Sequence, residues 1–444
     1  MSEKVLVLGA GESGCGAAYL AKKKGFEVIL SEFSAISDEN KAFLNQHDIP
    51  FEEGKHSENY VKNADLVIKS PGIPDKSPII QSILEKGKPL ISEIEFAYRY
   101  IDSGKIIAIT GSNGKTTTTS LIHHIISQLD NSVCLAGNIG LSLAKQVADR
   151  QFDYYVLELS SFQLDHCIDF KPDIAIILNI TPDHLDRYAD FSAYADAKWK
   201  LAQNLKKGDT LITWADDKHL QRTVNEDVNH LKFSTTQQVQ GYKSNDNLMV
   251  NANQTEWKFD LNACLLKGEH NQLNMMASAL ATQVLGLPKH LISQSFSNFS
   301  GVEHRLEFVL SHHNIDYIND SKATNVDAVF YALGAFEKPI IWIAGGVDKG
   351  NDYQQIKALV EQKVKTVICL GEDSKALETH FGKSKPFFKC ETMEQALKQA
   401  QTCAQSGDVV LLSPACASFD LFDNYEHRGE VFKTTVKTLT SCDY

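Results

Sequence analysis

Residues 105–117 read KIIAITGSNGKTT, and this stretch decides the fold of the region around it. The apolar run at 105–110 is typical of a buried strand, the glycines mark a tight loop, and a helix is predicted to begin near Lys115. The strict phosphate-loop pattern requires a glycine six residues before the lysine, where this chain has Ile109. The loop still offers successive N–H groups, a lysine for the β- and γ-phosphates and a hydroxyl for Mg²⁺. A simple glycine turn would not need the Lys-Thr pair. We therefore predict an ATP site formed by Gly111, Ser112, Asn113, Gly114, Lys115, Thr116 and Thr117.

A second glycine loop, GAGESG at residues 9–14, also follows a predicted strand and opens a predicted helix. Glu32 ends the next strand about twenty residues later, which is the context of the dinucleotide-binding fingerprint. The glycines show only that a diphosphate can approach the backbone at a helix N-terminus. NAD or FAD, another diphosphate ligand and a purely structural turn therefore all stay open at this point.

The chain of 444 residues predicts about three domains, since a domain averages about 150 residues. Short apolar runs alternate with helix-like stretches in the first hundred residues and again in the last third, which indicates parallel α/β sheets. Unbroken apolar strands at 154–159 and 174–180 belong at the centre of the middle sheet. A peripheral hairpin is expected between Ser244 and Lys267, where short alternating runs such as 256–261 occur, and a linker is expected at Pro288 and 293–301. We predict a three-domain α/β architecture with boundaries at 1–94, 95–300 and 301–444: a Rossmann-like domain, a central phosphate-loop domain and a second Rossmann-like domain.

Composition narrows the class of protein. The chain carries 44 Lys and Arg against 56 Asp and Glu, a formal net charge of −12, so DNA, RNA and anionic membranes are poor global partners. Nine cysteines occur without a C-x-x-C pair, which favours reduced thiols and a cytoplasmic location. No run approaches 18 apolar residues, so no membrane span is expected.

Two residues are candidate ligands for a divalent cation near the phosphate loop. Glu158 lies near the end of the predicted apolar strand at 154–159, and His184 follows the next predicted strand, at 174–180. The carboxyl ends of adjacent strands converge above a phosphate loop, where a carboxylate and an imidazole can hold a metal. Each residue also has an ordinary structural interpretation, as a helix cap or a histidine in a surface turn. On the sequence alone, Lys198 is predicted to be a solvent-exposed helix residue.

Five motifs taken together resemble the Mur ligases of peptidoglycan synthesis. They are GSNGKTT at 111–117, ELSSFQL at 158–164, DHLDRY at 183–188, NDSKATN at 319–325 and SPACAS at 413–418. The likeness spans all three predicted domains and is greatest to the ligases that add D-glutamate to UDP-N-acetylmuramoyl-L-alanine. It implies a monomeric, ATP- and Mg²⁺-dependent amide ligase that works through an acyl phosphate. No nucleophilic thiol is needed, so Cys416 is predicted to be a packed small residue.

The resemblance also implies roles for individual residues. Lys115 and Thr116 would hold phosphates and one Mg²⁺, and Glu158 and His184 a second, supported by a carbamate on Lys198. The remaining assignments are Asn271, Asn274, Arg305 and Asp320 for ATP; Gly11, Ser13, Gly14, Ser70, Gly72 and Asn138 for the UDP-substrate; and Thr324, Lys349, Ser418 and Tyr425 for D-glutamate.

The resemblance places Ser13 and the Ser70-Pro71-Gly72 loop on the uridine side of the substrate, and this chain departs from the family pattern there at Ser31-Glu32-Phe33. The alternatives are a sister ligase or a folate polyglutamylating enzyme, an oxidoreductase that uses the first glycine loop, and a non-catalytic nucleotide-binding module.

Overall fold

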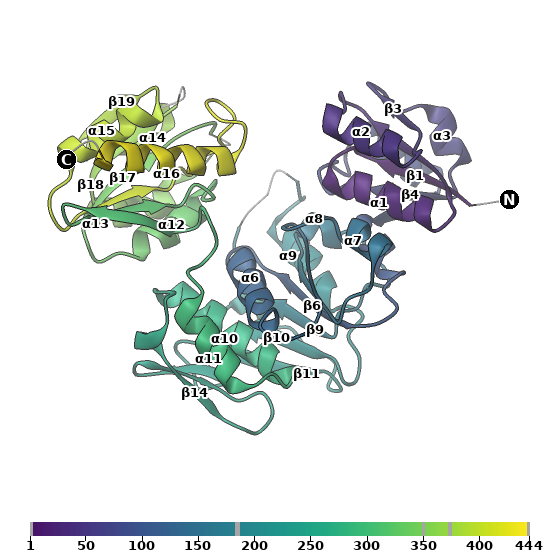
Figure 1. Cartoon of the computed structure of the whole chain (residues 1–444), viewed down its shortest axis with the longest axis horizontal. Helices are drawn as coiled ribbons and strands as arrows, with labels where there is room; N and C mark the ends of the chain where they lie inside the picture. The colour runs from purple at the N-terminus through teal and green to yellow at the C-terminus, as the bar shows by residue number, and fades with distance from the viewer. Residues whose placement is uncertain (1–2, 183–186, 349–350, 372–374, 442–444) are drawn as a thin grey trace. The chain divides into compact units, whose positions relative to one another are not determined.

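The computed structural model describes residues 3–182, 187–348, 351–371 and 375–441. The chain divides into two compact units, the first formed by Met1–Leu265 with Asn271–Phe299 and the second by Leu266–His270 with Ser300–Tyr444. The first unit contains two β-sheets and the second contains one (Figure 1). Each unit is described by itself below.

The N-terminal sheet is parallel, with strand order β3-β2-β1-β4-β5. Buried apolar side chains cover both of its faces, as expected when crossover helices pack on the two sides. The strand order reverses between β1 and β4, so the loops that follow these two strands flank the usual ligand crevice of such a sheet. The elements are β1 (Lys4–Leu8), α1 (Glu12–Lys23), β2 (Glu27–Glu32), α2 (Asp38–Gln46), β3 (Phe51–Glu53), α3 (Glu58–Asn63), β4 (Leu66–Lys69), α4 (Pro78–Glu85), β5 (Leu90–Ser92) and α5 (Glu93–Tyr98).

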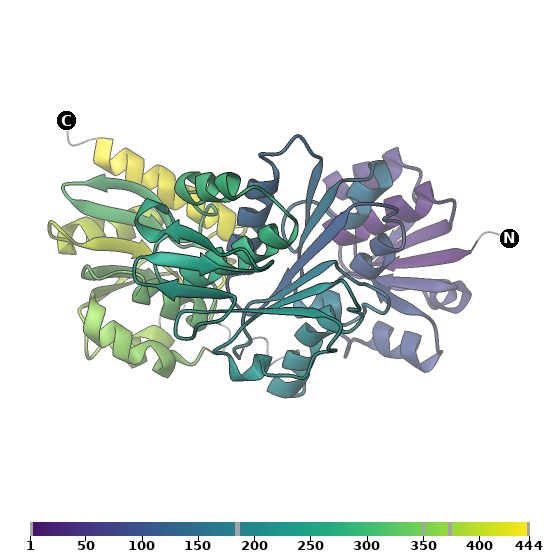
Figure 2. The same cartoon turned by 90° about the horizontal axis from the view of Figure 1, so that it is seen from below.

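The central sheet has nine strands in the order β14-β13-β12-β11-β10-β9-β6-β8-β7, and they can be followed in Figure 2. It is parallel from β7 to β12, and the last two strands run antiparallel at one edge, which confirms the predicted peripheral hairpin. The strand that leads into the phosphate loop, β6, lies inside the sheet between β8 and β9. The strands are β6 (Lys105–Thr110), β7 (Val133–Gly137), β8 (Tyr154–Glu158), β9 (Ile174–Ile177), β10 (Thr210–Trp214), β11 (Asn229–Ser234), β12 (Gly241–Ser244), β13 (Asn247–Val250) and β14 (Trp257–Asp260). The helices are α6 (Lys115–Ile126), α7 (Leu143–Asp149), α8 (Ser161–Leu164), α9 (Phe191–Trp199), α10 (Glu269–Val284) and α11 (Lys289–Asn298).

The sheet of the second unit has the order β15-β16-β20-β17-β18-β19 and is parallel except for the edge strand β15. Separate apolar clusters cover its two faces. Its strands are β15 (Glu307–His312), β16 (Ile315–Asn319), β17 (Ile340–Ala344), β18 (Val364–Leu370), β19 (Phe387–Cys390) and β20 (Val409–Leu412). Its helices are α12 (Val326–Gly334), α13 (Lys357–Lys363), α14 (Lys375–Phe381), α15 (Met393–Cys403) and α16 (Tyr425–Ser441).

Three sheets therefore stand where the sequence predicts three α/β domains, although the first two belong to one compact unit. Their contact includes buried Glu93, whose Oε1 accepts hydrogen bonds from the Ser142 hydroxyl and the Ala144 amide, both at 2.7 Å. The predicted boundary at 94 lies inside α5. The linker predicted at 293–301 is wrong over most of its length, because α11 continues to Asn298.

The apolar helices and the cysteines bear on two predictions made from composition. Among the described residues, no helix combines the length and the apolar character needed to cross a bilayer. The eight cysteines in the described part of the chain are free thiols.

Candidate active site

The phosphate loop joins β6 to α6 in a conformation that requires glycine at its end. Gly114 caps α6 with φ +84°, and a Cβ at this position would lie 2.4 Å from the Asn274 Oδ1. Lys115 Nζ donates to the carbonyl oxygens of Gly111 and Ser112 at 2.9 and 3.0 Å. The first amides of any α-helix have no carbonyl acceptor within the helix, and they carry a partial positive charge. The start of α6 is therefore built to bind a phosphate.

Asn179, just beyond β9, holds the loop in place. Its carbonyl oxygen and its Oδ1 accept from the amides of Ser112 and Asn113 at 2.9 and 2.8 Å, and its Nδ2 donates to the Asn113 carbonyl at 3.0 Å. The amides of Ser112 and Asn113 thus act in shaping the loop. Sequence analysis did not single out Asn179 as a site residue, although its position at the end of a central strand was the available signal.

Glu158, the last residue of β8, is buried beside this loop. In the register of the sheet it pairs with Ile109 of β6, two residues before Gly111, and its side chain is 1% exposed. Asn138 Nδ2 donates to Glu158 Oε1 at 2.8 Å, while no hydrogen-bond partner among the described residues reaches Oε2. A buried carboxylate oxygen without a partner is costly unless a cation balances it. The donor set therefore fits a divalent cation at this edge of the sheet.

Lys198 corrects an expectation from the sequence. The prediction of a solvent-exposed helix residue is wrong, because the side chain is 2% exposed on the inner face of α9. Its Nζ donates to the Gly111 carbonyl at 2.7 Å and lies 4.6 Å from the centroid of the Tyr194 ring. The structure thus brings two lysine amines, those of Lys115 and Lys198, to one carbonyl oxygen of the phosphate loop.

The Asn271 and Asn274 side chains on α10 also reach this region. Asn274 Oδ1 accepts from the Thr118 hydroxyl of α6 at 3.3 Å, and its Nδ2 donates to Asn271 Oδ1 at 3.2 Å. The structure therefore places these two predicted residues beside the start of the phosphate-loop helix.

The glycine loop of the N-terminal sheet is tightly packed at two positions and open at a third. A Cβ on Gly14 would lie 1.9 Å from the Gly9 carbonyl oxygen, and a Cβ on Gly9 would lie 2.6 Å from the Ser70 Oγ. A Cβ on Gly11 would meet nothing within 4 Å. The predicted residues Gly11, Ser13 and Gly14 follow β1, and Ser70 and Gly72 follow β4, the strand beside β1 in the sheet.

The acidic residue of the dinucleotide fingerprint is engaged with the backbone. Glu32 accepts from the amides of Ala10 and Ser34, each at 2.8 Å, so both of its carboxylate oxygens tie loops together. Phe33, the next residue, is 70% exposed. Glu12 at the start of α1 accepts from the Ser142 amide at 3.1 Å, which connects the glycine loop to the loop that carries Asn138.

In the second unit, the loops after β16 and β20 carry the predicted residues. Asp320 is buried and accepts from the Ser413 hydroxyl at 2.7 Å and the Leu306 amide at 3.2 Å. Burial raises the pKa of Asp320 to about 7, although these hydrogen bonds and the charge of Arg305 act in the opposite direction. Thr324 and Ser418 lie in the loops that follow the neighbouring strands β16 and β20, and Tyr425 is the first residue of α16. Ser418 is 2% exposed, whereas Thr324 is partly exposed.

Comparison with known proteins decides the family. Family models match residues 4–79 (MurD N-terminal domain), 109–282 (Mur ligase middle domain) and 304–416 (Mur ligase, glutamate ligase domain). The chain is 46% identical to the UDP-N-acetylmuramoylalanine–D-glutamate ligase of Christiangramia forsetii and 47% identical to that of Cytophaga hutchinsonii, covering 99% of this chain and 100% of each relative. The chain belongs to the Mur ligase family.

Solved structures of Mur ligases share the fold. The UDP-N-acetylmuramate–alanine ligase of Thermotoga maritima matches 99% of this chain and 100% of its own with a TM-score of 0.62 at 19% identity. A MurF ligase of the same organism, solved in complex with ADP, matches with the same TM-score at 16% identity and covers 93% of this chain and 95% of its own. These matches show the three-domain Mur ligase architecture.

One residue of this Mur ligase that sequence analysis missed is Arg428. Its buried guanidinium donates to the Ser321 Oγ at 2.9 Å, the Ser321 carbonyl at 2.8 Å and the Cys416 carbonyl at 3.2 Å, so it joins two site loops. The spacing of Arg428 from Phe432 and Val436 on the buried face of α16 was the available signal. Cys416 is buried, and burial raises the pKa of its thiol to about 11, which supports a packing role.

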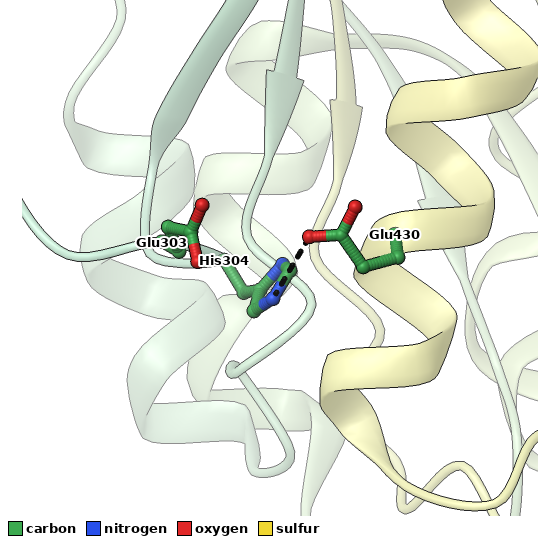
Figure 3. Close-up of side chains that lie close together, drawn as sticks. All are labelled: Glu303, His304 and Glu430. Carbon is green, nitrogen blue, oxygen red and sulfur yellow. Dashed lines mark ion pairs between the residues drawn. The ribbon is translucent and has the colours of Figure 1, made fainter. Parts of the chain in front are cut away.

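Glu303, His304 and Glu430 form a cluster in the Mur ligase's second unit, with the His304 Nε2 at 3.8 Å from the Glu430 Oε1 (Figure 3). Lys433 Nζ contacts Glu430 at 2.6 Å and Glu303 at 3.4 Å, and the His304 Nδ1 lies 3.0 Å from the Asn319 Nδ2. The lysine ammonium already forms ion pairs with both carboxylates, so we interpret the cluster as an ion-pair network. Two predicted site residues of the Mur ligase, His184 and Lys349, lie outside the described residues.

Proposed function

We propose that this chain is the ATP-dependent ligase that joins D-glutamate to UDP-N-acetylmuramoyl-L-alanine in peptidoglycan precursor synthesis, acting as a monomer in the cytoplasm. The observation that carries the proposal is a formed phosphate loop beside the buried, incompletely paired carboxylate of Glu158. The names of relatives that match over the full length supply the two substrates.

The proposed chemistry has two steps. The alanyl carboxylate attacks the γ-phosphorus of ATP, and the bond to the β–γ bridging oxygen breaks. The products of this step are ADP and an acyl phosphate. The amine of D-glutamate then attacks the acyl carbon, loses a proton, and displaces inorganic phosphate. Phosphoryl transfer requires positioning and neutralisation of charge more than covalent participation by the protein. Lys115 and the first amides of α6 supply both at the phosphates.

Mg²⁺ fits the residues at this edge of the central sheet. Glu158 offers a buried carboxylate oxygen with no hydrogen bond from the described residues, and the side chain of Thr116 is buried at the start of α6. Oxygen ligands of this kind are those that Mg²⁺ prefers. We propose that Thr116 holds one ion and that Glu158, with His184, holds a second. Bound Mg²⁺ would neutralise the charge of the phosphates and the reacting carboxylate.

The surroundings of Lys198 support its proposed carbamylation. Its amine and that of Lys115 both donate to the Gly111 carbonyl, and two ammonium groups at one oxygen repel each other. Reaction of a neutral amine with CO₂ forms an N–C bond and releases a proton, which leaves a carbamate anion in place of a cation. A carbamate would replace the repulsion with attraction to Lys115 and to the metal.

The remaining site assignments are proposals that rest on the family. For ATP, Asn271 and Asn274 have support from their contact with α6, and Asp320 and Arg305 from the electrostatic interaction between them in the second unit. For D-glutamate we propose Thr324, Lys349, Ser418 and Tyr425, since hydroxyls and a lysine suit a dicarboxylate.

The experiment that tests the function measures phosphate release by the purified protein with each substrate omitted in turn. Release should require ATP, Mg²⁺, UDP-N-acetylmuramoyl-L-alanine and D-glutamate together. Transfer of ¹⁸O from the labelled alanyl carboxylate into phosphate would establish the acyl phosphate. Phosphate release that continues without the UDP-substrate or without D-glutamate would refute the proposal.

A further inference from the structure

Arg187 connects the loop after β4 to the central sheet. Its Nη2 donates to the Pro71 carbonyl at 3.2 Å and its Nη1 to the Gly72 carbonyl at 3.4 Å. Both carbonyls belong to the loop that starts at Ser70, whose buried hydroxyl lies against the glycine loop of the N-terminal sheet. Because a trans peptide directs its N–H opposite to its C=O, the hydrogen bond to the Pro71 carbonyl also sets the direction of the Gly72 amide. Arg187 thus orients backbone groups in the loop that follows β4.

The same guanidinium stacks on an aromatic residue of the Glu158 motif. The Arg187 Cζ lies 4.4 Å from the centroid of the Phe162 ring. Phe162 is the second residue of α8. This short helix has its start fixed by a capping box between Ser160 and Gln163. A rigid platform therefore supports the side chain that reaches across to the Pro71 and Gly72 carbonyls.

From Phe162, aromatic contacts continue to the phosphate loop. The Phe162 and Tyr188 rings are stacked with centroids 5.8 Å apart, and Tyr188 makes an edge contact with Tyr194 at 5.5 Å. The Tyr194 hydroxyl lies 3.0 Å from the Ser112 Oγ, and its ring lies beneath Lys198. Hydrogen bonds and aromatic contacts therefore connect the Pro71 carbonyl to the loop that would bind ATP.

We propose that Arg187 is a positioning residue of the UDP-substrate site, and that the chain Arg187–Phe162–Tyr188–Tyr194 couples this site to the phosphate loop. Binding of the UDP-substrate against the 70–72 loop would restrain Arg187, and the stacked rings would then favour one arrangement of Ser112 and Lys198. The inference rests on the proposed function, because it assigns the crevice between β1 and β4 to the UDP-substrate. Coupling of this kind is reciprocal, so ATP should also strengthen binding of the UDP-substrate.

The test compares Arg187→Met with a matched control. Methionine keeps an apolar stem on the Phe162 ring and removes the donors to both carbonyls. Arg150→Met is the control, because Arg150 also stacks on a phenylalanine, Phe152, at 4.4 Å, and neither residue is assigned to a binding site. Thermal unfolding of all the proteins shows whether each variant is folded. Arg187→Lys, which keeps the charge and loses the planar fork, is the second variant if Arg187→Met is unstable.

Calorimetry would give the Kd of UDP-N-acetylmuramoyl-L-alanine with and without a non-hydrolysable ATP analogue, and kinetics would give KM and kcat. Arg187→Met should raise the Kd and the KM for the UDP-substrate about tenfold and leave the KM for D-glutamate unchanged. The ratio of the UDP-substrate Kd without the ATP analogue to that with it should fall to about one. Arg150→Met should match the wild type.

Three outcomes would overturn the inference: a UDP-substrate Kd within twofold of the wild type in Arg187→Met, an equal rise in the KM of all three substrates, or the same losses in Arg150→Met. Wild-type protein that binds both nucleotides with coupling but forms no amide would refute the proposed function and leave this inference standing.

Discussion

Two alanine substitutions in the glycine loop of the N-terminal sheet should separate stability from substrate binding. Gly14 and Gly11 lie three residues apart at the start of α1. A Cβ on Gly14 would lie 1.9 Å from the Gly9 carbonyl oxygen, whereas a Cβ on Gly11 would meet no atom within 4 Å. Gly11 also has φ −78°, which alanine adopts without strain. The same chemical change therefore tests packing at one position and the approach of a ligand at the other.

The expected magnitudes follow from these distances. Gly14→Ala forces the turn to open by about 1 Å, which costs about 3 kcal/mol as overpacking. Alanine recovers about 1 kcal/mol as a better helix former. The net loss of about 2 kcal/mol corresponds to a fall in Tm of about 4–8 °C. For Gly11→Ala, the weaker N-cap and the smaller entropy of the unfolded chain differ by only a few tenths of a kcal/mol, so Tm should hardly change.

Substrate binding should change in Gly11→Ala, the variant whose Tm hardly changes. The open space at Gly11 is where a diphosphate would contact the backbone, so a methyl group there should raise the KM for UDP-N-acetylmuramoyl-L-alanine at least about tenfold, or about 1.4 kcal/mol. The KM values for ATP and D-glutamate should stay within twofold. The assays are thermal unfolding and coupled phosphate release with each substrate varied. An unchanged KM for the UDP-substrate in Gly11→Ala would refute the placement of the diphosphate, and an unchanged Tm in Gly14→Ala would refute the packing argument.

Three further substitutions test the remaining parts of the site. Glu158→Gln removes the charge of the buried carboxylate and keeps its shape, so kcat should fall at least about a hundredfold and the Mg²⁺ concentration needed for half-maximal activity should rise. A titration of activity with Mg²⁺ measures both, and an unaltered titration would contradict the metal assignment. Lys198→Ala should lose most activity and regain part of it with added short carboxylates, which replace the carbamate; kinetics with and without acetate give the answer, and no recovery would count against the carbamate. Asp320→Asn concerns pH: because the pKa of the folded state, about 7, lies above that of an unfolded aspartate, this residue contributes stability that is complete below about pH 4 and is lost as the pH rises toward 7. Between pH 5 and pH 8 the free energy of unfolding should therefore fall by about 1–3 kcal/mol more in the wild type than in Asp320→Asn, since one pKa unit corresponds to about 1.4 kcal/mol. Urea unfolding at several pH values measures this difference. Equal pH dependence in the two proteins would show that Asp320 is not the group responsible.

Much of the fold follows from local signals. The strand at 105–110, the glycine loop and the start of α6 form where the residue pattern predicts them, because apolar run, loop and helix start are each encoded within a few residues. The linker prediction failed because a serine-rich composition was given more weight than the helical spacing of Ile292, Ser295 and Phe296, which α11 buries. Compositional signals for loops are weak when a buried periodicity is also present.

The candidate site divides in the same way. From the sequence alone came the chemistry of the motifs: a phosphate loop with Lys115, a strand-end carboxylate at Glu158, and the resemblance that orders the other assignments. Only the tertiary structure decided that Lys198 is buried against Gly111, that Asn179 holds the phosphate loop, and that Arg187 reaches the 70–72 loop. These contacts join residues between 66 and 116 positions apart. No local pattern can specify such pairs, because they exist only when the free energy of packing whole helices and sheets brings distant side chains together.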